Sequence, residues 1–327
     1  MRHDLDDTDR RIVAALLAAP RASWRRTAAA LDLSERTVVR RAGPLLHDGT
    51  VRVTAVRHPR CFPRLVPLAL RIRCRPQHIR TVAAALARRP DTVWVDILGD
   101  GNEISTVLFL QGPEARNTLL LRDLPATDAV TSWTSHTLLR VFPVAFGWTG
   151  GLLTQAETDA LGLRPPTPPP GPLALDDTDH ALIQALCADG RATYTDLARR
   201  ARTTPLAARR RTERLIGRAV RLATEVDLAL LGIGADALLW ITVAPHALDA
   251  TAHALSGNPQ VRFTAATTGP ANLLAAVAAT DLEALYRLFT ETLDGLPHIT
   301  ALETTPILTT FKRAGLRYVQ SDTGILR

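Results

Sequence analysis

The chain has 327 residues, of which 46% are hydrophobic and 22% charged, and its formal net charge is +7. These values exclude a disordered chain and leave room for about two to four domains, each able to bury its own core. The three scattered cysteines, Cys61, Cys74 and Cys187, have no metal-ligand spacing, which argues against a disulfide framework and a zinc site. The first residues do not resemble a signal peptide, and no apolar run approaches a membrane span. We therefore expect a cytoplasmic protein with no membrane partner and no cofactor.

Positive charge is concentrated in two stretches of the chain. Residues 1–60 hold 12 arginines and 7 acidic residues, and residues 173–225 hold 10 arginines and 7 acidic residues. The two stretches have net charges of +5 and +3, which together give +8. Because the whole chain has a net charge of +7, the remaining residues sum to −1. A polyanionic partner accounts for this distribution. The alternative is arginine-rich helix faces that meet only water, and charge alone does not separate the two.

The first 60 residues predict three short helices and a strand. Asp6, Ser23 and Ser34 each precede a helical pattern and are predicted N-caps, whose side chains accept hydrogen bonds from the first turn. Pro20 ends the first helix, and Val51–Val56 alternates as a strand does. Three helices followed by a small strand pair are typical of a winged helix-turn-helix, which we assign to residues 1–60.

The third helix contains one conflicting feature. Gly43 and Pro44 fall inside it, and an interior proline removes a hydrogen bond at a cost of about 3 kcal/mol. We therefore expect a kink or an early end near Ala42.

Residues 61–150 predict a small α+β domain. Its predicted strands are Leu65–Ile72, Thr92–Leu98, Glu103–Leu110 and Val130–Phe142, and its predicted helices are His78–Ala87 and Pro113–Leu121. The resulting order, βαββαβ, is that of a ferredoxin-like domain.

A linker and a repeat divide the chain into halves. Arg164–Pro172 reads RPPTPPPGP and predicts an extended spacer. LDDTD at Leu5–Asp9 recurs at Leu175–Asp179, and the same offset aligns about forty residues without a gap. We predict an α+β fold with two tandem copies of a winged helix-turn-helix followed by a ferredoxin-like domain. The second copy comprises residues 173–230 and 235–315.

The second copy repeats the order of elements of the first. Asp176, Thr193 and Thr204 are its predicted N-caps. Its predicted strands are Ala237–Val243, Val261–Thr268, Asn272–Ala279 and Ile299–Phe311, and its predicted α+β helices are His246–Leu255 and Asp281–Leu293.

Several motifs of both halves resemble the Lrp/AsnC family of feast/famine transcription regulators. The openings read LDDTDRRIVAAL and LDDTDHALIQAL, and the third-helix stretches read SERTVVRRAGPL (Ser34–Leu45) and TPLAARRRTERL (Thr204–Leu215). GRATYTDLA at Gly190–Ala198 matches the family's second-helix pattern, which PRASWRRTA follows less closely. The resemblance implies a sequence-specific DNA-binding regulator without enzymatic activity, in which a RAM-type α+β domain follows each helix-turn-helix.

Double-stranded DNA is the partner that this resemblance implies, and the third helix of the first copy suits it best. At helical spacing, Val38, Ala42 and Leu45 form a buried stripe, while Arg36 and Arg40 point outward together. The outward set of the second copy is Leu206, Arg210 and Glu213, which ranks it as electrostatic support. The candidate DNA contacts are Arg21, Arg25, Arg26, Ser34, Arg36, Thr37, Arg40, Arg41, Thr204, Arg209, Arg210 and Arg211.

The resemblance also implies a small effector, often an amino acid, bound near the loop between the second and third strands of the α+β domain. Candidate effector contacts are Gly99, Asp100 and Asn102 in the first copy and Thr268, Gly269 and Asn272 in the second. The family usually has aspartate where this chain has Asn102 and Asn272, and a tight hairpin turn explains the same residues. Because the family pairs two α+β domains, the two halves are expected to form an intramolecular pseudo-dimer, which assembles into a homo-oligomer.

Two other functions compete with regulation. Siroheme decarboxylases resemble the same two-domain plan, and His136, His246, His253 and His298 are the histidines available to line a tetrapyrrole cleft. A protein-interaction module that has lost DNA binding is suggested by Pro44 and Glu213 on the third helices.

Overall fold

The computed structural model describes residues 5–142, 148–162, 173–293, 295–296 and 298–318. The predicted linker Arg164–Pro172 therefore lies outside the described residues. The chain forms two compact units: the first contains Met1–Phe62 and Leu139–Thr304, and the second contains Pro63–Leu138 and Thr305–Arg327. Within the described ranges, no helix has the length and apolar character needed to cross a membrane.

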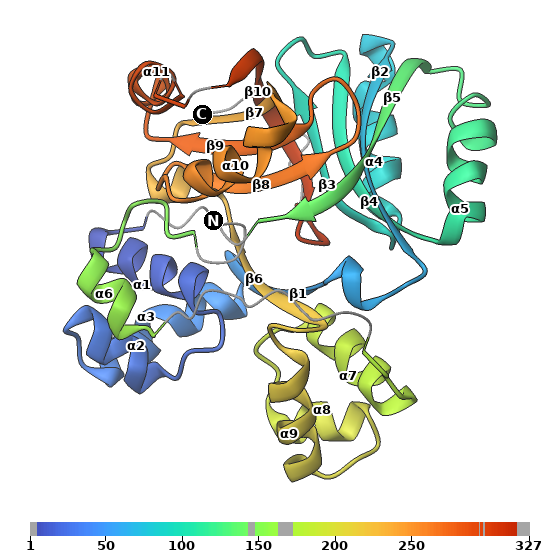
Figure 1. Cartoon of the computed structure of the whole chain (residues 1–327). Coiled ribbons are helices and arrows are strands. Elements are labelled where there is room, and N and C mark those ends of the chain that lie inside the picture. Colours follow the sequence, from blue (N-terminus) through green and yellow to red (C-terminus); the bar gives the residue numbers. More distant parts are fainter. Residues whose placement is uncertain (1–4, 143–147, 163–172, 294, 297, 319–327) are drawn as a thin grey trace. The chain divides into compact units, whose positions relative to one another are not determined.

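The first helix-turn-helix, here called the first head, comprises α1 (Asp7–Ala18), α2 (Trp24–Leu31) and α3 (Glu35–His47) (Figure 1). The predicted caps are confirmed, since the side chains of Asp6, Ser23 and Ser34 each accept a backbone N–H from the first turn. These contacts satisfy N–H groups that have no partner inside the helix. The three helices enclose a small core that includes Ile12 and Val38.

The second head comprises α7 (Asp177–Ala188), α8 (Tyr194–Arg200) and α9 (Pro205–Leu215). Asp176, Thr193 and Thr204 cap these helices in the same way, as predicted. Leu182, Leu186 and Leu197 lie in its core.

The predicted strand after the first head is present, but its partner differs from the prediction. β1 (Val51–Arg57) pairs antiparallel with β6 (Val220–Val226) of the second head, from Val51 opposite Val226 to Arg57 opposite Val220. The two heads thus share one ribbon, and within the residues that the structure describes neither head has a strand pair of its own. The alternating pattern identified the strand because it is local, whereas pairing across about 170 residues leaves no mark in that pattern.

The expected early end of α3 near Ala42 is also corrected, whereas the alternative of a kink stays a prediction. α3 continues past Ala42 to His47 with Pro44 inside it. The proline ring is exposed, and the next residue, Leu45, is buried at 5% exposure. Burial of Leu45 offsets part of the lost hydrogen bond, because core contacts rather than backbone propensity supply most of the stability of a helix in a protein.

The second unit contains the first α+β domain. Its elements are β2 (Leu65–Cys74), α4 (Ile79–Arg88), β3 (Thr92–Leu98), β4 (Glu103–Gln111), α5 (Gly112–Thr118) with a π-helical turn (Leu119–Asp123), and β5 (Val130–Val141). The strand order is β5-β2-β4-β3, followed by the end of β10 and by β11 (Leu316–Arg317). The order of the first four strands is that of the predicted ferredoxin-like plan.

The first unit contains the second α+β domain. Its elements are β7 (Ala235–Val243), α10 (Leu248–Ser256), β8 (Val261–Thr267), β9 (Leu273–Ala279), α11 (Leu282–Arg287) and β10 (Ile299–Arg313). The order β10-β7-β9-β8 repeats the ferredoxin-like plan. α10 and α11 pack on the sheet around a core of aliphatic side chains (Figure 1). Short connecting helices in the described part of the chain are Pro59–Cys61, Pro76–His78, Leu228–Leu231, Pro245–Ala247 and Leu288–Leu293.

Among the α-helices of the described residues, one was not predicted. α6 (Gln155–Ala160) packs against α2 of the first head, and Leu161, which follows it, is buried at 1% exposure in that head's core. Glu157 forms an ion pair with Arg11 of α1 and completes a capping box with Thr154. The described residues include no such helix on the second head.

Candidate nucleic-acid interface

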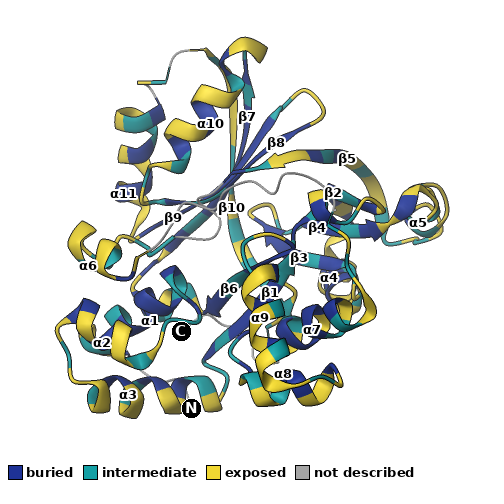
Figure 2. Ribbon diagram, turned by 60° about the horizontal axis from the view of Figure 1, so that its bottom comes forward, coloured by how far each residue is buried: buried dark blue, intermediate teal, exposed yellow. Residues whose placement is uncertain are grey.

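The outward face of α3 presents two free arginines. Val38 and Ala42 are fully buried, while Arg36 and Arg40 are exposed one helical turn apart. Exposed and buried residues alternate along both α3 and α9 (Figure 2). Among the described residues, neither Arg36 nor Arg40 makes a hydrogen bond or an ion pair. Two guanidinium groups so placed can donate to guanine edges or to phosphates.

Arg41 and Arg211 have partners inside the protein. Arg41 binds the carboxylates of Asp6 and Asp9 at the start of α1. Arg211 occupies the matching place on α9 and binds Asp176 at 2.7 Å and Asp179 at 2.9 Å. A guanidinium held by two carboxylates is neutralised, so we take Arg41 and Arg211 out of the predicted DNA contacts. Their role is to tie the third helix of each head to the first.

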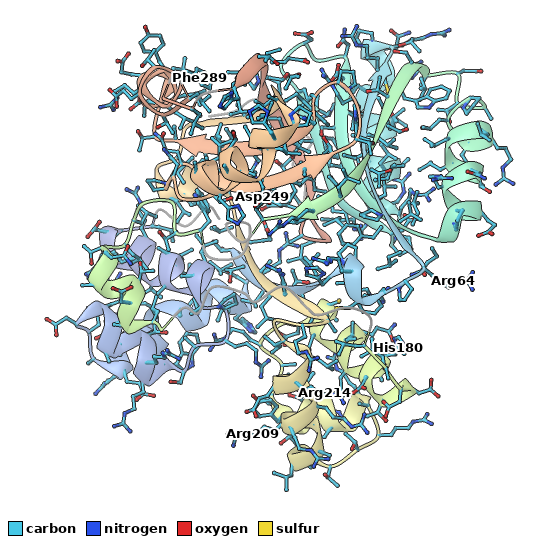
Figure 3. All side chains as sticks on the ribbon, in the orientation of Figure 1. Arg64, His180, Arg209, Arg214, Asp249 and Phe289 are labelled. Atoms are coloured by element: carbon cyan, nitrogen blue, oxygen red, sulfur yellow. The ribbon has the colours of Figure 1, made fainter. Side chains whose placement is uncertain are left out.

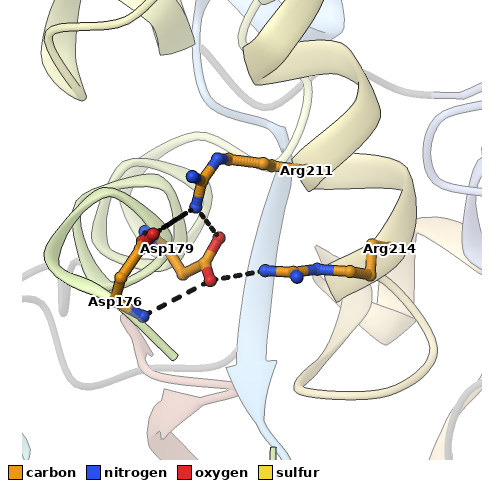
Figure 4. A network of polar contacts seen from close by, with 4 residues as sticks. All are labelled: Asp176, Asp179, Arg211 and Arg214. Carbon is orange, nitrogen blue, oxygen red and sulfur yellow. Dashed lines mark hydrogen bonds and ion pairs between the residues drawn. The ribbon is translucent and has the colours of Figure 1, made fainter. Parts of the chain in front are cut away.

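The tie is stronger in the second head. The side chain of Asp179 is 2% exposed and binds Arg214 at 2.5 Å in addition to Arg211, as Figure 4 shows. The N–H of Asp179 and the guanidinium of Arg211 lower the pKa of Asp176 below its ordinary value. In the first head the N–H of Asp9 and the guanidinium of Arg41 lower the pKa of Asp6 likewise. Each carboxylate is thus ionised at neutral pH and stabilises the helix start.

The outward face of α9 differs from that of α3. Leu206 is 78% exposed at the place that Arg36 occupies on α3. Arg209, labelled with Arg214 in Figure 3, is held at 2.9 Å by Glu213 one turn along the helix. Arg210 is exposed and, among the described residues, unpaired. Among the described residues, the outward face of α9 therefore presents one unpaired arginine, whereas that of α3 presents two.

Arg21 also has partners inside the protein. Its guanidinium donates to the carbonyls of Gly190 at 2.8 Å and Ala192 at 3.0 Å in the second head. We therefore remove it from the predicted DNA contacts. Arg25 and Arg26 are exposed on α2 and stay candidates, although Arg26 lies against Gly162 after α6.

The small polar candidates act first as caps. The Ser34 hydroxyl accepts from the N–H of Thr37 at 3.0 Å and lies 2.8 Å from the Thr37 hydroxyl. Thr204 accepts from the N–H of Ala207 at 3.2 Å. Both caps stand at the start of a third helix, where a DNA phosphate would approach.

The predicted effector residues lie in two hairpin turns. In the first copy Gly99 and Asp100 are exposed, and the carbonyl of Asn102 accepts from the N–H of Cys74 at 2.8 Å. Gly101, between them, has a φ of +67°. The turn thus needs glycine for its backbone, and Asp100 beside it is exposed.

In the second copy the turn residues support the sheet. Both side-chain atoms of the Asn272 amide bind the backbone of Val243, its oxygen accepting at 2.9 Å and its nitrogen donating at 2.8 Å. Thr268 and Gly269 are exposed. Asn272 therefore holds the end of β7, and its amide is not free for an effector. Elsewhere in the described ranges, no group of three or more His, Cys, Asp or Glu residues could hold a metal ion.

Sequence reasoning missed two sets of residues around the heads. Asp179 and Arg214 form the buried tie, and Arg191 binds the first head. The repeat itself contained the signal for Arg191, since this residue matches Arg21 at the offset that aligns the two copies.

Comparisons with known proteins assign both kinds of domain. The AsnC-type helix-turn-helix domain matches residues 5–44 and 175–216, and the Lrp/AsnC ligand binding domain matches residues 236–316. An uncharacterised HTH-type transcriptional regulator of Pyrococcus abyssi is 29% identical over 143 residues, which are 43% of this chain and 90% of that protein. The transcriptional regulator AzlB of Bacillus subtilis is 26% identical over 146 residues, 43% of this chain and 93% of that protein.

A solved structure resembles the whole chain. The crystal structure of the siroheme decarboxylase NirDL covers 95% of this chain and 94% of its own, with a TM-score of 0.60 and 13% sequence identity. Its complex with an iron-uroporphyrin III analogue gives a TM-score of 0.58 at 14% identity. At this identity the likeness shows a common fold. The two matches of the helix-turn-helix domain, the ligand binding domain that follows the second, and the two regulators lead to one conclusion: the chain belongs to the Lrp/AsnC family of transcriptional regulators.

Proposed function

We propose that this chain is a sequence-specific DNA-binding regulator that arose by tandem duplication, and that its first head reads bases through Arg36 and Arg40. One observation carries the proposal. On α3 these two guanidiniums are exposed and unpaired among the described residues, while the next arginine, Arg41, is neutralised by Asp6 and Asp9. Because these two guanidinium groups bind no partner among the described residues, they do not stabilise the head, and they are available to bind a polyanion.

The second head supports this reading with charge. Arg210 is its free recognition-helix arginine, and Glu213 both neutralises Arg209 and repels a phosphate. The two heads therefore contribute unequally, which suits an operator whose two half-sites differ in sequence.

The test is a footprint across the promoter region of the protein's own gene. The wild-type chain is expected to protect a discrete stretch, and Arg36→Glu/Arg40→Glu to weaken binding by about a hundredfold or more, because two strong contacts become repulsive. If the arginines read bases, Arg36→Ala relaxes sequence preference; if they bind phosphates, the slope of log K against log salt falls by about one per residue.

A charge-matched control separates these contacts from general electrostatics. Arg116→Glu/Arg122→Glu makes the same charge change on α5 and the turn after it, where Arg122 is 75% exposed. This control is expected to keep the footprint. If a folded Arg36→Glu/Arg40→Glu protein still protects the same stretch of DNA, the proposal that α3 reads bases through these arginines is refuted.

An effector is part of the same proposal. The ligand binding domain match covers the second α+β domain, and of the turn residues considered, Asp100 of the first domain keeps a free carboxylate able to hold an ammonium group. Thermal unfolding in the presence of each common amino acid tests it: one of them is expected to raise Tm, and Asp100→Asn to remove that rise.

A second candidate, a siroheme-decarboxylase-like enzyme, is favoured by the whole-chain likeness to NirDL. The rings of His246 and His298 lie 4.7 Å apart, and the imidazole of His253 lies 2.8 Å from the carbonyl of Asp249. Titration with iron-uroporphyrin III, followed by the Soret band, separates the functions. A saturable shift that His246→Ala/His298→Ala removes would favour the enzyme, and no shift together with a salt-sensitive footprint would favour the regulator.

A further inference from the structure

The two heads exchange arginine contacts. Arg21, in the turn between α1 and α2, donates to the carbonyls of Gly190 and Ala192 at 2.8 and 3.0 Å. Its guanidinium carbon also stands 5.2 Å from the centre of the Tyr194 ring. All three partners belong to the turn and helix start between α7 and α8 of the second head.

The second head returns the same contacts. Arg191 donates to the carbonyls of Pro20 at 2.6 Å and Ala22 at 3.3 Å, and its guanidinium carbon lies 4.1 Å from the Trp24 ring centre. Each partner here is the counterpart, in the aligned repeat, of a partner of Arg21. We call Arg21, Arg191, Trp24 and Tyr194, with the four carbonyls, the head clasp.

Among the described residues, neither guanidinium of the clasp forms an ion pair, although the nearby carboxylate of Asp189 opposes the lowering of the Arg191 pKa. Burial and the nearby Arg21 lower the pKa of Arg191 to about 10, so both arginines remain charged at neutral pH. Carbonyl oxygens and aromatic faces offset the repulsion. Two like charges stay close together only where other contacts offset their repulsion. These contacts hold the two heads in one arrangement, which points to a positioning role for the two arginines.

The ribbon between the heads allows them to twist relative to each other, and the clasp restricts that motion. β1 and β6 form an isolated two-stranded ribbon, and such ribbons twist and are marginal by themselves. Thr54 of β1 donates to the carbonyl of Cys187 at 2.7 Å, and Thr224 of β6 donates to that of Leu16 at 2.6 Å. These contacts fix α1 and α7 against the ribbon, while the clasp acts one turn further along, where α2 and α8 begin.

From these contacts we infer that the head clasp sets the separation and orientation of α3 and α9, so that the chain accepts only DNA whose two half-sites stand at one spacing. The part of this inference that concerns DNA spacing rests on the proposed function. α2 and α8 carry α3 and α9 through the helix-turn-helix packing. Rotation of either head about the ribbon would have to break the two arginine contacts at once.

Close packing at Gly190 supports a fixed arrangement. A Cβ built on Gly190 would stand 2.7 Å from Val53 Cγ1 and 2.9 Å from the backbone nitrogen of Thr54. The Gly190 N–H donates to the Val53 carbonyl at 2.8 Å. The second head thus lies against β1 at a place where no side chain fits.

The first experiment measures the arrangement without DNA. Spin labels are placed on α3 and α9 through Val39→Cys and Leu206→Cys, which are 44% and 78% exposed, in a Cys187→Ala background. The distance distribution is expected to be narrow, and to broaden or shift in Arg21→Ala/Arg191→Ala. Arg21→Lys/Arg191→Lys keeps the charges but loses the fork that reaches two carbonyls, and is expected to broaden it as well. Arg116→Ala/Arg122→Ala is the matched control and leaves it unchanged.

The second experiment measures spacing preference. In duplexes carrying the protected stretch, an insert of about five base pairs between its two half-sites turns one half-site to the opposite side of the helix. The wild-type affinity is expected to fall about tenfold or more, and that of the clasp variants to fall much less. Circular dichroism and thermal unfolding establish that both variants are folded.

The outcomes keep the two proposals apart. An unchanged distance distribution in both clasp variants overturns the clasp, whether or not DNA is bound. A wild-type chain that binds no duplex overturns the regulator, and the spin-label result still decides the role of the clasp. Broadening with an unchanged spacing preference overturns the link from clasp to half-site spacing.

Discussion

The third helices of the two heads bury matching positions but have different outward faces. On α3 the buried residues are Val38, Ala42 and Leu45, and on α9 the matching Ala208, Thr212 and Leu215 are buried too. On the outward faces Arg36 matches Leu206, whereas Arg40 matches Arg210. The third helices of the two heads thus bury matching positions, whereas the residues that they expose differ.

One aligned pair links this divergence to stability. Pro44 of the first head matches Arg214 of the second. Arg214 extends the buried tie through Asp179, whereas in the first head Asp9 binds only Arg41, at 3.2 Å, among the described residues. The first head therefore loses a helix hydrogen bond and an ion pair at a single position.

The largest expected effect separates the two ties. Asp179→Asn leaves Arg211 and Arg214 without their common carboxylate, which is 2% exposed. We expect a loss of about 3 kcal/mol in the free energy of unfolding, since removing one partner of a buried pair strands the other. Asp9→Asn, at a carboxylate 16% exposed with one arginine, should cost about 1 kcal/mol.

Urea unfolding of both variants measures this difference. Circular dichroism in the native state checks that each variant starts folded. Equal losses for Asp179→Asn and Asp9→Asn would contradict the view that the second head is tied more strongly.

The next effect is a gain. Pro44→Arg restores a donor inside α3 and places a cation where Arg214 stands in the second head. We expect stabilisation of about 2 kcal/mol, below the full cost of an interior proline because Pro44 lies in the last turns of the helix. Pro44→Ala serves as the matched control, because it restores the helix hydrogen bond without adding a cation. Thermal unfolding measures both, and a Tm equal to or below that of the wild type would contradict the account.

The parts of this structure that the sequence predicted are those with local causes. The caps Asp6 and Thr204 follow from residue type and the helix pattern after them, and strands such as Thr92–Leu98 from their apolar runs. The partner of β1 was missed because pairing between distant segments depends on how the heads meet. α6 was missed because a six-residue helix makes too few periodic positions to be recognised.

The candidate interface was predictable to a similar depth. Helical spacing placed Arg36 and Arg40 outward, and the structure leaves them exposed. The same spacing did not distinguish Arg41, since whether an arginine meets a phosphate or a carboxylate depends on Asp6 and Asp9 of another helix. Arg21 was misplaced for the same reason, because its acceptors are carbonyls of the other head.

The smallest expected effect is on the free energy of unfolding at acidic pH, where the two heads should behave alike. Asp6 and Asp176 both have a pKa below the ordinary 3.8 in the folded chain. A lowered pKa means that the folded state binds the proton more weakly than the unfolded state does, so the ionised carboxylate stabilises the fold. That stabilisation is complete above the unfolded value and disappears as pH falls through the folded one. The free energy of unfolding, measured with urea from pH 5 down to the acid transition, should therefore fall less steeply in Asp176→Asn, and equally so in Asp6→Asn, than in the wild type. The two caps are similarly exposed, at 52% and 54%, and Arg214 is the smallest of the causes that lower the pKa of Asp176. Slopes that differ strongly between the two variants would therefore contradict the expectation that the two caps behave alike.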